Sequence, residues 1–290
     1  MNVRKKFLWH AGAYRLSLGE RTLVMGIVNA TPDSFSGDGV RSGNPREKIP
    51  GLRYARQLAD DGADIIDIGG ESTRPGARAV SLKEEAARVI PLISALARSI
   101  KIPISIDTRQ PEVVREALEA GVSIVNLVQG TPADVRILER VAHAGAGLVL
   151  MHMRGTPQTM QRHCRYTDVV LDVRNELKKS LDNCSLYGIK KASIVVDPGI
   201  GFSKTAEQNL LLLQRLRIIA ALPYPVLIGT SRKSFIGKTL GVDVDGRLMG
   251  TVVTGALAIA AGTHILRVHD VKAMKQAAQM ADAVVGANLS

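Results

Sequence analysis

The sequence predicts an α/β fold of the (β/α)8 TIM-barrel class, with a short β-hairpin ahead of the barrel. Eight short apolar runs recur along the 290 residues, and segments with helical periodicity lie between them. Many of these segments close with a glycine, as helices that end in a left-handed residue do. Eight strand–helix alternations in a chain of this length are typical of a closed parallel barrel.

The hairpin is expected at about residues 7–21 and the barrel at about 22–285, within one domain that spans 1–290, because no linker or low-complexity segment divides the chain. The expected strands cover 23–28, 65–68, 102–106, 124–128, 147–151, 193–196, 226–228 and 265–268. The expected helices cover 48–61, 83–99, 111–120, 132–143, 167–188, 207–221, 246–262 and 271–285. An open doubly wound sheet is the alternative, but Gly26 and Gly37 do not form the GxGxxG that usually follows its first strand.

Composition points to a soluble protein of the cytoplasm. Hydrophobic residues make up 46% of the chain, and no uninterrupted apolar run reaches the ~18 residues of a membrane span. The basic N-terminus is not followed by the apolar core of a signal peptide, because His10 and Arg15 interrupt it. Cys164 and Cys184 form no CxxC, which favours free thiols over a zinc site.

The formal charge of +11 suggests acidic partners. The cations are scattered and aromatic residues are only 3% of the chain, so stacking platforms for nucleic acid are scarce. This pattern favours a small molecule that carries phosphate over nucleic acid or a membrane.

Polar residues stand where the expected strands end, which is where barrels place their catalytic groups. Each has a structural explanation taken singly, since a terminal Asp can cap the next helix and His152 can be a structural histidine. Taken together, Asp107, Asn126 and Asp197 can converge with Lys233 on one pocket, and their oxygens suit the N–H groups of a nitrogen-rich heterocycle. A separate anion site is expected at Asn29, Arg267 and His269, on adjoining strands.

Several motifs in order resemble the dihydropteroate synthase family. They are the loops after the first two strands, Met25-Gly26-Ile27-Val28-Asn29-Ala30-Thr31-Pro32-Asp33-Ser34-Phe35-Ser36 and Asp67-Ile68-Gly69-Gly70-Glu71-Ser72-Thr73-Arg74-Pro75-Gly76, then Ser105-Ile106-Asp107-Thr108, Leu150-Met151-His152-Met153, Asp197-Pro198-Gly199-Ile200-Gly201-Phe202, Ser231-Arg232-Lys233-Ser234 and Arg267-Val268-His269-Asp270. The resemblance runs from about residue 23 to 285. It implies a transferase of folate biosynthesis that condenses (7,8-dihydropterin-6-yl)methyl diphosphate with 4-aminobenzoate, giving 7,8-dihydropteroate and diphosphate.

The resemblance also implies roles for individual residues. The catalytic residues would be Asp107, Asp197 and Lys233, and the pterin would be held by Asp107, Asn126, Asp197 and Lys233. The diphosphate would be held by Asn29 with Mg2+ and by Arg74, Arg267 and His269. The aminobenzoate would be held by Phe35, Thr73, Pro75, Ser231 and Lys233. The family is commonly homodimeric, and the small-residue segment 248–262 suits such an interface or a helix buried on the barrel. Sulfonamides, as mimics of 4-aminobenzoate, are expected to compete.

The expected chemistry is a dissociative substitution. Departure of diphosphate leaves a delocalised carbocation on the pterin, which the carboxylates of Asp107 and Asp197 would stabilise as it forms. The aryl amine is neutral at pH 7, so no strong base is required. Closure of the first two loops would exclude water, which captures such a cation.

Two departures from the family pattern leave alternatives open. Asn126-Leu127 stands where Asn-Asp is usual, and Ser36-Gly37-Asp38-Gly39 stands where Ser-Asp-Gly-Gly is commoner. The alternatives are a non-catalytic or altered-substrate pterin-binding paralogue and a pterin-dependent methyltransferase domain. A methyltransferase domain has no reason to keep a diphosphate site at Asn29, Arg267 and His269.

Overall fold

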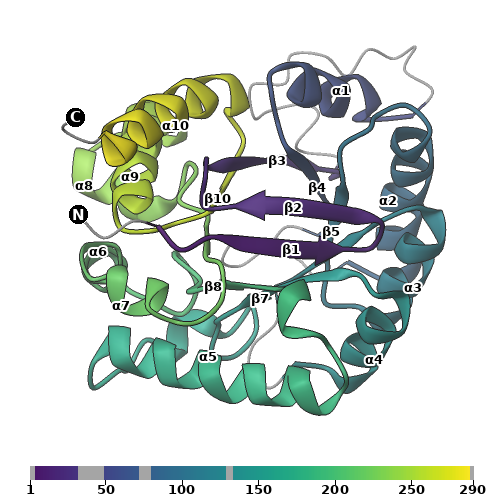
Figure 1. Ribbon diagram of the computed structural model, residues 1–290, viewed down its shortest axis with the longest axis horizontal. Helices are drawn as coiled ribbons and strands as arrows, with labels where there is room; N and C mark the ends of the chain where they lie inside the picture. The colour runs from purple at the N-terminus through teal and green to yellow at the C-terminus, as the bar shows by residue number, and fades with distance from the viewer. Residues whose placement is uncertain (1–3, 32–48, 72–79, 129–132, 288–290) are drawn as a thin grey trace.

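A computed structural model describes residues 4–31, 49–71, 80–128, 133–287 of the chain. Parallel strands alternate with helices and form one sheet in the order β8-β7-β6-β5-β4-β3-β10-β9, with the helices around the outside (Figure 1). The two ends of this order meet through a parallel bridge between Val196 and Val226. The sheet therefore closes, which confirms the predicted (β/α)8 barrel.

The strands and helices follow the predicted order with shifted ends. The hairpin is β1 (Phe7–Ala11) and β2 (Tyr14–Leu18), and the barrel strands are β3 (Leu23–Asn29), β4 (Ile65–Gly69), β5 (Ile104–Asp107), β6 (Ile124–Leu127), β7 (Gly147–Met151), β8 (Ile194–Asp197), β9 (Leu227–Ile228) and β10 (Ile265–Val268). The helices are α1 (Leu52–Asp60), α2 (Leu82–Ala97), α3 (Pro111–Ala120), α4 (Val135–Ala144), α5 (Val169–Leu186), α6 (Ala206–Gln214), α7 (Arg217–Ala220), α8 (Ser234–Leu240), α9 (Leu248–Ala260) and α10 (Val271–Gly286).

Two helical segments differ from the prediction. The segment 207–221 divides into α6 and α7, because the chain tightens into i→i−3 hydrogen bonds where Leu216 N donates to Leu213 O and Ile218 N to Arg215 O. Helix α8, directly after the Ser231-Arg232-Lys233 run, was not predicted. Its seven residues are too few for helical periodicity to stand out in the sequence.

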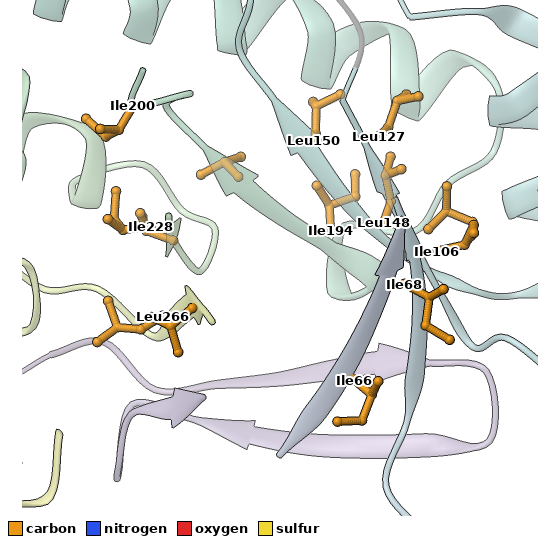
Figure 2. Close-up of a cluster of buried hydrophobic side chains, with 14 of the residues drawn as sticks. Ile66, Ile68, Ile106, Leu127, Leu148, Leu150, Ile194, Ile200, Ile228 and Leu266 are labelled. Atoms are coloured by element: carbon orange, nitrogen blue, oxygen red, sulfur yellow. The ribbon is translucent and has the colours of Figure 1, made fainter. Parts of the chain in front are cut away.

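Side chains alternate along each strand between the barrel interior and the surrounding helices. The outward set includes Ile66, Ile68 and Ile106, which join one large cluster with the inner faces of the helices. Figure 2 shows part of this cluster, with Leu148 and Leu150 of β7 beside Leu127 of β6. Dispersion and the hydrophobic effect in this layer hold the helices onto the sheet.

The inward set fills the floor of the barrel, and the hairpin covers it. Met25, Ile65 and Val149 pack with Trp9 and Leu18 in a separate buried cluster. Trp9 is fully buried, and its indole Nε1 donates a hydrogen bond to the carbonyl of Ser193 at 3.0 Å. This confirms the hairpin and places it at the amino ends of the strands, opposite the strand ends that carry the predicted site.

In the described ranges, none of the helices has the length and apolar character needed to cross a membrane. Cys164 and Cys184 are both free thiols, as the missing CxxC predicted.

Candidate active site

The barrel mouth collects the acidic residues that the sequence predicted at the strand ends. Asp107 ends β5 and Asp197 ends β8, while Asn126 lies one residue before the end of β6. Their neighbours Ile106, Val125 and Val196 belong to the outward cluster, so the polar side chains face the interior. All three are buried. The structure therefore brings together the predicted pterin-binding oxygens.

Arg267 links this group. Its Nε donates to Oδ2 of Asp67 and its Nη2 to Oδ2 of Asp107, both at 2.6 Å. The amide of Asn126 donates to the same Asp67 oxygen at 3.1 Å. One buried carboxylate therefore orients two residues of the predicted site.

Asp67 was missed by the sequence reasoning as a site residue. It exposes none of its surface, and its Oδ1 is an acceptor without a hydrogen-bond partner in the described chain. The signal was present in the sequence, because Asp67 is an acid inside the otherwise apolar run Ile65-Ile66-Asp67-Ile68. Buried charges are costly unless they are paired, so an acid at an inward strand position indicates a cationic partner.

Burial in the barrel mouth favours the protonated form of Asp107. Burial raises the pKa of Asp107 to about 7, against the opposing attraction of Arg267 and with help from the neighbouring charge of Asp67. Burial also raises the pKa of Asp197, although Lys233 opposes this shift. A ligand that donates hydrogen bonds to such a carboxylate stabilises its ionised form.

Lys233 stands beside Asp197, as predicted. Its ammonium donates to the carbonyl of Ile200 and lies 4.6 Å from the ring centroid of Phe202. Burial lowers the pKa of Lys233 to about 8, although the charge of Asp197 raises it. The backbone N–H of Gly199 donates to Oδ1 of Asp197 at 2.7 Å. The loop after β8 thus holds both side chains.

A second group lies across the mouth. The hydroxyl of Ser231 is 2.9 Å from Nδ1 of His269 and accepts a hydrogen bond from the His269 backbone N–H at 3.1 Å. The amide nitrogen of Asn29 is 3.5 Å from Nε2 of the same imidazole. Asn29 and His269 are brought together as predicted, on the adjacent strand ends of β3 and β10.

Two basic residues of the mouth make contacts that the sequence did not predict. Arg267, grouped with Asn29 and His269, extends instead to Asp67 and Asp107. Arg232, which had no assigned role, forms an ion pair with Asp270, with Nε at 3.0 Å and Nη2 at 2.6 Å from the carboxylate oxygens. This pair fastens the loop after β9 to the loop after β10.

Four residues of the sequence-based assignment, Phe35, Thr73, Arg74 and Pro75, lie outside the described residues. Thr73, Arg74 and Pro75 belong to the loop after β4. At the start of that loop, Glu71 accepts two hydrogen bonds from Arg109, each 3.1 Å long. This bidentate pair ties the start of the loop after β4 to the end of β5.

In the part of the chain that the structure describes, no group of three or more His, Cys, Asp or Glu side chains could hold a metal ion. The amide oxygen of Asn29 is the donor that suits a hard cation at the His269 side of the mouth. Mg2+ is typically held by one or two protein oxygens together with substrate phosphates, so this donor set fits a cation that arrives with a diphosphate.

The chain is similar to known proteins over nearly its whole length. Residues 25–269 match the family described as pterin binding enzyme. A dihydropteroate synthase of Synechocystis sp. is 49% identical over 267 residues, which cover 92% of this chain and 91% of the relative.

Two solved structures are similar in shape as well as sequence. The Yersinia pestis dihydropteroate synthase with a sulfonamide drug complex has a TM-score of 0.88 at 36% identity, covering 97% of this chain and 100% of that one. The Xanthomonas albilineans dihydropteroate synthase with 4-aminobenzoic acid has a TM-score of 0.88 at 38% identity, covering 98% and 100%.

Proposed function

The chain belongs to the pterin-binding enzyme family and, within it, to the dihydropteroate synthases, and we propose that it joins 4-aminobenzoate to (7,8-dihydropterin-6-yl)methyl diphosphate, releasing diphosphate and 7,8-dihydropteroate. The observation that carries this proposal is the convergence of Asp107, Asn126 and Asp197 with Lys233 at the carboxyl ends of the barrel strands. This is the transferase step of folate biosynthesis that the sequence motifs imply.

The acidic end of the mouth supports pterin binding. A pterin presents ring N–H and amino donors along one edge, and Asp107, Asp197 and the amide oxygen of Asn126 are acceptors for them. Lys233 offers a donor on the other side. Because Asp67 and Arg267 orient Asn126 and Asp107 before any ligand binds, little side-chain ordering is left to the binding step.

The other end supports diphosphate binding by Asn29, His269 and Arg267, with Arg74 joining from a loop outside the described residues. Mg2+ would be held there by the Asn29 amide oxygen and would stabilise the charge of the leaving diphosphate. Arg267 contacts Asp107, and His269 follows directly after β10, the strand that carries Arg267, so this strand end reaches both ends of the mouth. The 4-aminobenzoate pocket would then be formed by Ser231, Thr73, Pro75, Phe35 and the aliphatic part of the Lys233 side chain.

The residues fit a dissociative substitution, in which the carbon–oxygen bond to the diphosphate breaks before the amine attacks. Negative charge from Asp107 and Asp197 faces the pterin, where positive charge develops as the diphosphate leaves. The attacking amine of 4-aminobenzoate is neutral at pH 7, so its lone pair is available without a general base. Lys233, with a pKa lowered to about 8 by burial, is mostly protonated at pH 7, and the charge of Asp197 beside it offsets part of its repulsion toward that cation.

Two alternatives make different predictions. A non-catalytic pterin binder would bind the pterin diphosphate but form no dihydropteroate. A pterin-dependent methyltransferase domain would share Asp107, Asn126 and Asp197, but would have no use for the contact between Asn29 and His269.

The deciding experiment supplies the pterin diphosphate, 4-aminobenzoate and Mg2+ and measures diphosphate release and dihydropteroate formation, with and without the amine. Amine-dependent formation of dihydropteroate is the expected result. Lys233→Ala should strongly impair turnover, because it removes a pterin contact and a wall of the aminobenzoate pocket. Pterin binding without product would refute the synthase assignment. Competition by a sulfonamide against 4-aminobenzoate tests the second pocket in the same assay.

We further propose that the enzyme works as a homodimer in the cytoplasm. Helix α9 buries Thr251, Gly255 and Ala258 against the barrel and α10, while its opposite face exposes Met249, Val253 and Leu257, spaced four residues apart. Met280 and Val284 of α10, the helix that packs beside it (Figure 1), are also exposed. An apolar stripe on two neighbouring helices is the kind of surface that a second copy covers.

A further inference from the structure

Lys204 is a buried lysine outside the residues so far assigned to the substrates. It follows the loop after β8 and is only 3% exposed. Its Nζ donates to the carbonyls of Gly199 at 3.0 Å and Phe202 at 2.9 Å, and lies 3.2 Å from Nδ1 of His152. A lysine ammonium has three N–H donors and no acceptor, so these contacts use all of them.

The contact with His152 fixes the state of that imidazole. Because Lys204 in its ammonium form can only donate, Nδ1 of His152 accepts from it, and the ring proton lies on Nε2. Nε2 then donates to the carboxylate of Glu176 at 3.0 Å. Burial and the charge of Lys204 lower the pKa of His152 to about 4, so the ring stays neutral. The chain Lys204–His152–Glu176 is therefore a fixed hydrogen-bonded unit.

The Lys204–His152–Glu176 unit contacts the loop after β8, which lies against the site residue Lys233. The two carbonyls that Lys204 holds bracket Ile200 and Gly201, and the carbonyl of Ile200 accepts the hydrogen bond from Lys233. A Cβ atom at Gly201 would lie 2.8 Å from Cδ of Lys233, so the loop backbone and that side chain are in direct contact. Lys204 and Lys233 therefore both contact the backbone of this loop.

The same loop is held in a strained conformation. Ser203, a non-glycine residue, has φ +48° and is completely buried. Its hydroxyl accepts a hydrogen bond from the backbone N–H of Arg154 at 3.1 Å. The N–H of Gly201 is also held, by Oδ1 of Asn209 at 2.6 Å. Strain of this kind persists only where the surroundings over-determine the backbone.

We propose that Lys204 is a positioning residue for the pterin site: by holding the carbonyls of Gly199 and Phe202, it fixes the loop that presents Asp197 and Lys233 to the pterin. Lys204 acts through this loop and does not itself contact the substrate. The proposal rests on the proposed function of the site, and it explains why a cation is kept in a place where burial lowers its pKa to about 7.

The test compares Lys204→Met with a matched control at the opposite end of the barrel. Arg4 is also a buried cation that donates to a backbone carbonyl, that of Thr263 at 2.9 Å, and it pairs with Asp282 near the floor. Arg4→Met therefore removes a comparable buried donor away from the mouth. Dissociation constants for the pterin diphosphate are measured by calorimetry at a temperature where each variant is folded, beside turnover of the unaltered enzyme.

Lys204→Met is expected to weaken pterin binding at least tenfold, while Arg4→Met lowers the melting temperature but changes that constant less than twofold. In a Lys233→Ala background, Lys204→Met should weaken binding less than threefold, because one of the two contacts that it positions is already gone. A merely structural role would give the same fold-change in both backgrounds, and that result would overturn the inference. Lys204→Gln, which keeps one donor, should lie between and replaces Lys204→Met if the latter does not fold.

The two proposals fail separately. If the unaltered enzyme forms no dihydropteroate, the proposed function is wrong. If it does form dihydropteroate, and Lys204→Met or Lys204→Gln binds the pterin diphosphate as the unaltered enzyme does, the positioning role is wrong.

Discussion

Nε of Arg267 donates a hydrogen bond to Oδ2 of Asp67 at 2.6 Å, although the two residues are 200 positions apart in the sequence. The pair lies inside the barrel, where Asp67 exposes none of its surface. The attraction of Asp67 and Asp107 outweighs the effect of burial and raises the pKa of Arg267 above its ordinary value. Arg267 thus stays charged and neutralises the acidic end of the mouth in the free enzyme.

Arg267→Lys tests this pairing. An ammonium is a point charge and cannot bridge both carboxylates as the guanidinium does, so one buried charge loses its partner. We expect the free energy of unfolding to fall by about 3 kcal/mol, within the range for a broken buried pair. We also expect kcat/KM to fall ~100-fold, as for loss of one oriented donor. Urea denaturation and steady-state kinetics measure the two effects.

Arg115→Lys is the control for that substitution. Arg115 pairs with Glu119 on the exposed face of α3, where an ion pair contributes little. Its urea midpoint and kinetics should match those of the unaltered enzyme. An Arg267→Lys variant that behaved like this control would show that the buried pair does not organise the site.

The raised pKa of Asp107 predicts a pH dependence of pterin binding. Asp107 accepts hydrogen bonds best when ionised, and its pKa is about 7 because of burial. The dissociation constant for the pterin diphosphate should therefore decrease as the pH rises from about 5.5 to 7.5, the window in which this carboxyl loses its proton. Asp107→Asn should bind weakly and lose this dependence. Equal slopes in the two proteins would assign the titration to another group.

The same pKa shift makes the contribution of Asp107 to folding stability decrease as the pH rises, opposite to the expected effect on pterin binding. The folded-state pKa of Asp107 lies above the ordinary 3.8, so the native state holds the proton more tightly than the unfolded chain. The contribution of Asp107 to stability is largest below pH 3.8 and decreases as the pH rises toward about 7. Asp107→Asn should thus gain stability relative to the unaltered protein across that interval, as followed by urea midpoints.

Trp9→Ala tests the hairpin as a plug of the barrel floor. Trp9 packs against Gly147, where a Cβ atom would lie 3.0 Å from the indole. Its removal opens a cavity and leaves the Ser193 carbonyl without this donor, at a cost of about 3–5 kcal/mol. Circular dichroism melts measure the loss. At a temperature where the variant is folded, kcat should be unchanged, because the plug and the site lie at opposite ends of the strands.

Leu257→Glu tests the proposed dimer. Leu257 is 64% exposed on α9 in the single chain, and a carboxylate there would be buried against the partner in a dimer. We expect the variant to be monomeric by light scattering coupled to gel filtration. Leu186→Glu is the control, because Leu186 is 80% exposed at the end of α5. A dimeric Leu257→Glu protein would place the interface elsewhere.

Local patterns were enough to predict the barrel. Alternating inward and outward positions in short apolar runs, with helical periodicity between them, require no knowledge of distant contacts. The predicted ends of strands and helices were less accurate. The strand expected at 102–106 begins at Ile104, since Pro103 has no N–H to donate to a neighbouring strand. The gathering of the polar residues at one rim was also predictable, because barrel topology places every strand end there.

The order of the strands and helices and the set of polar residues at the rim follow from the sequence alone. The contacts of Arg267 with Asp67 and Asp107, and of Lys204 with the loop that follows Asp197, became visible only in the folded chain. The physical reason is that these side chains are oriented by the charge and hydrogen-bond partners they meet when buried, and those partners come from strands and loops far away in the chain.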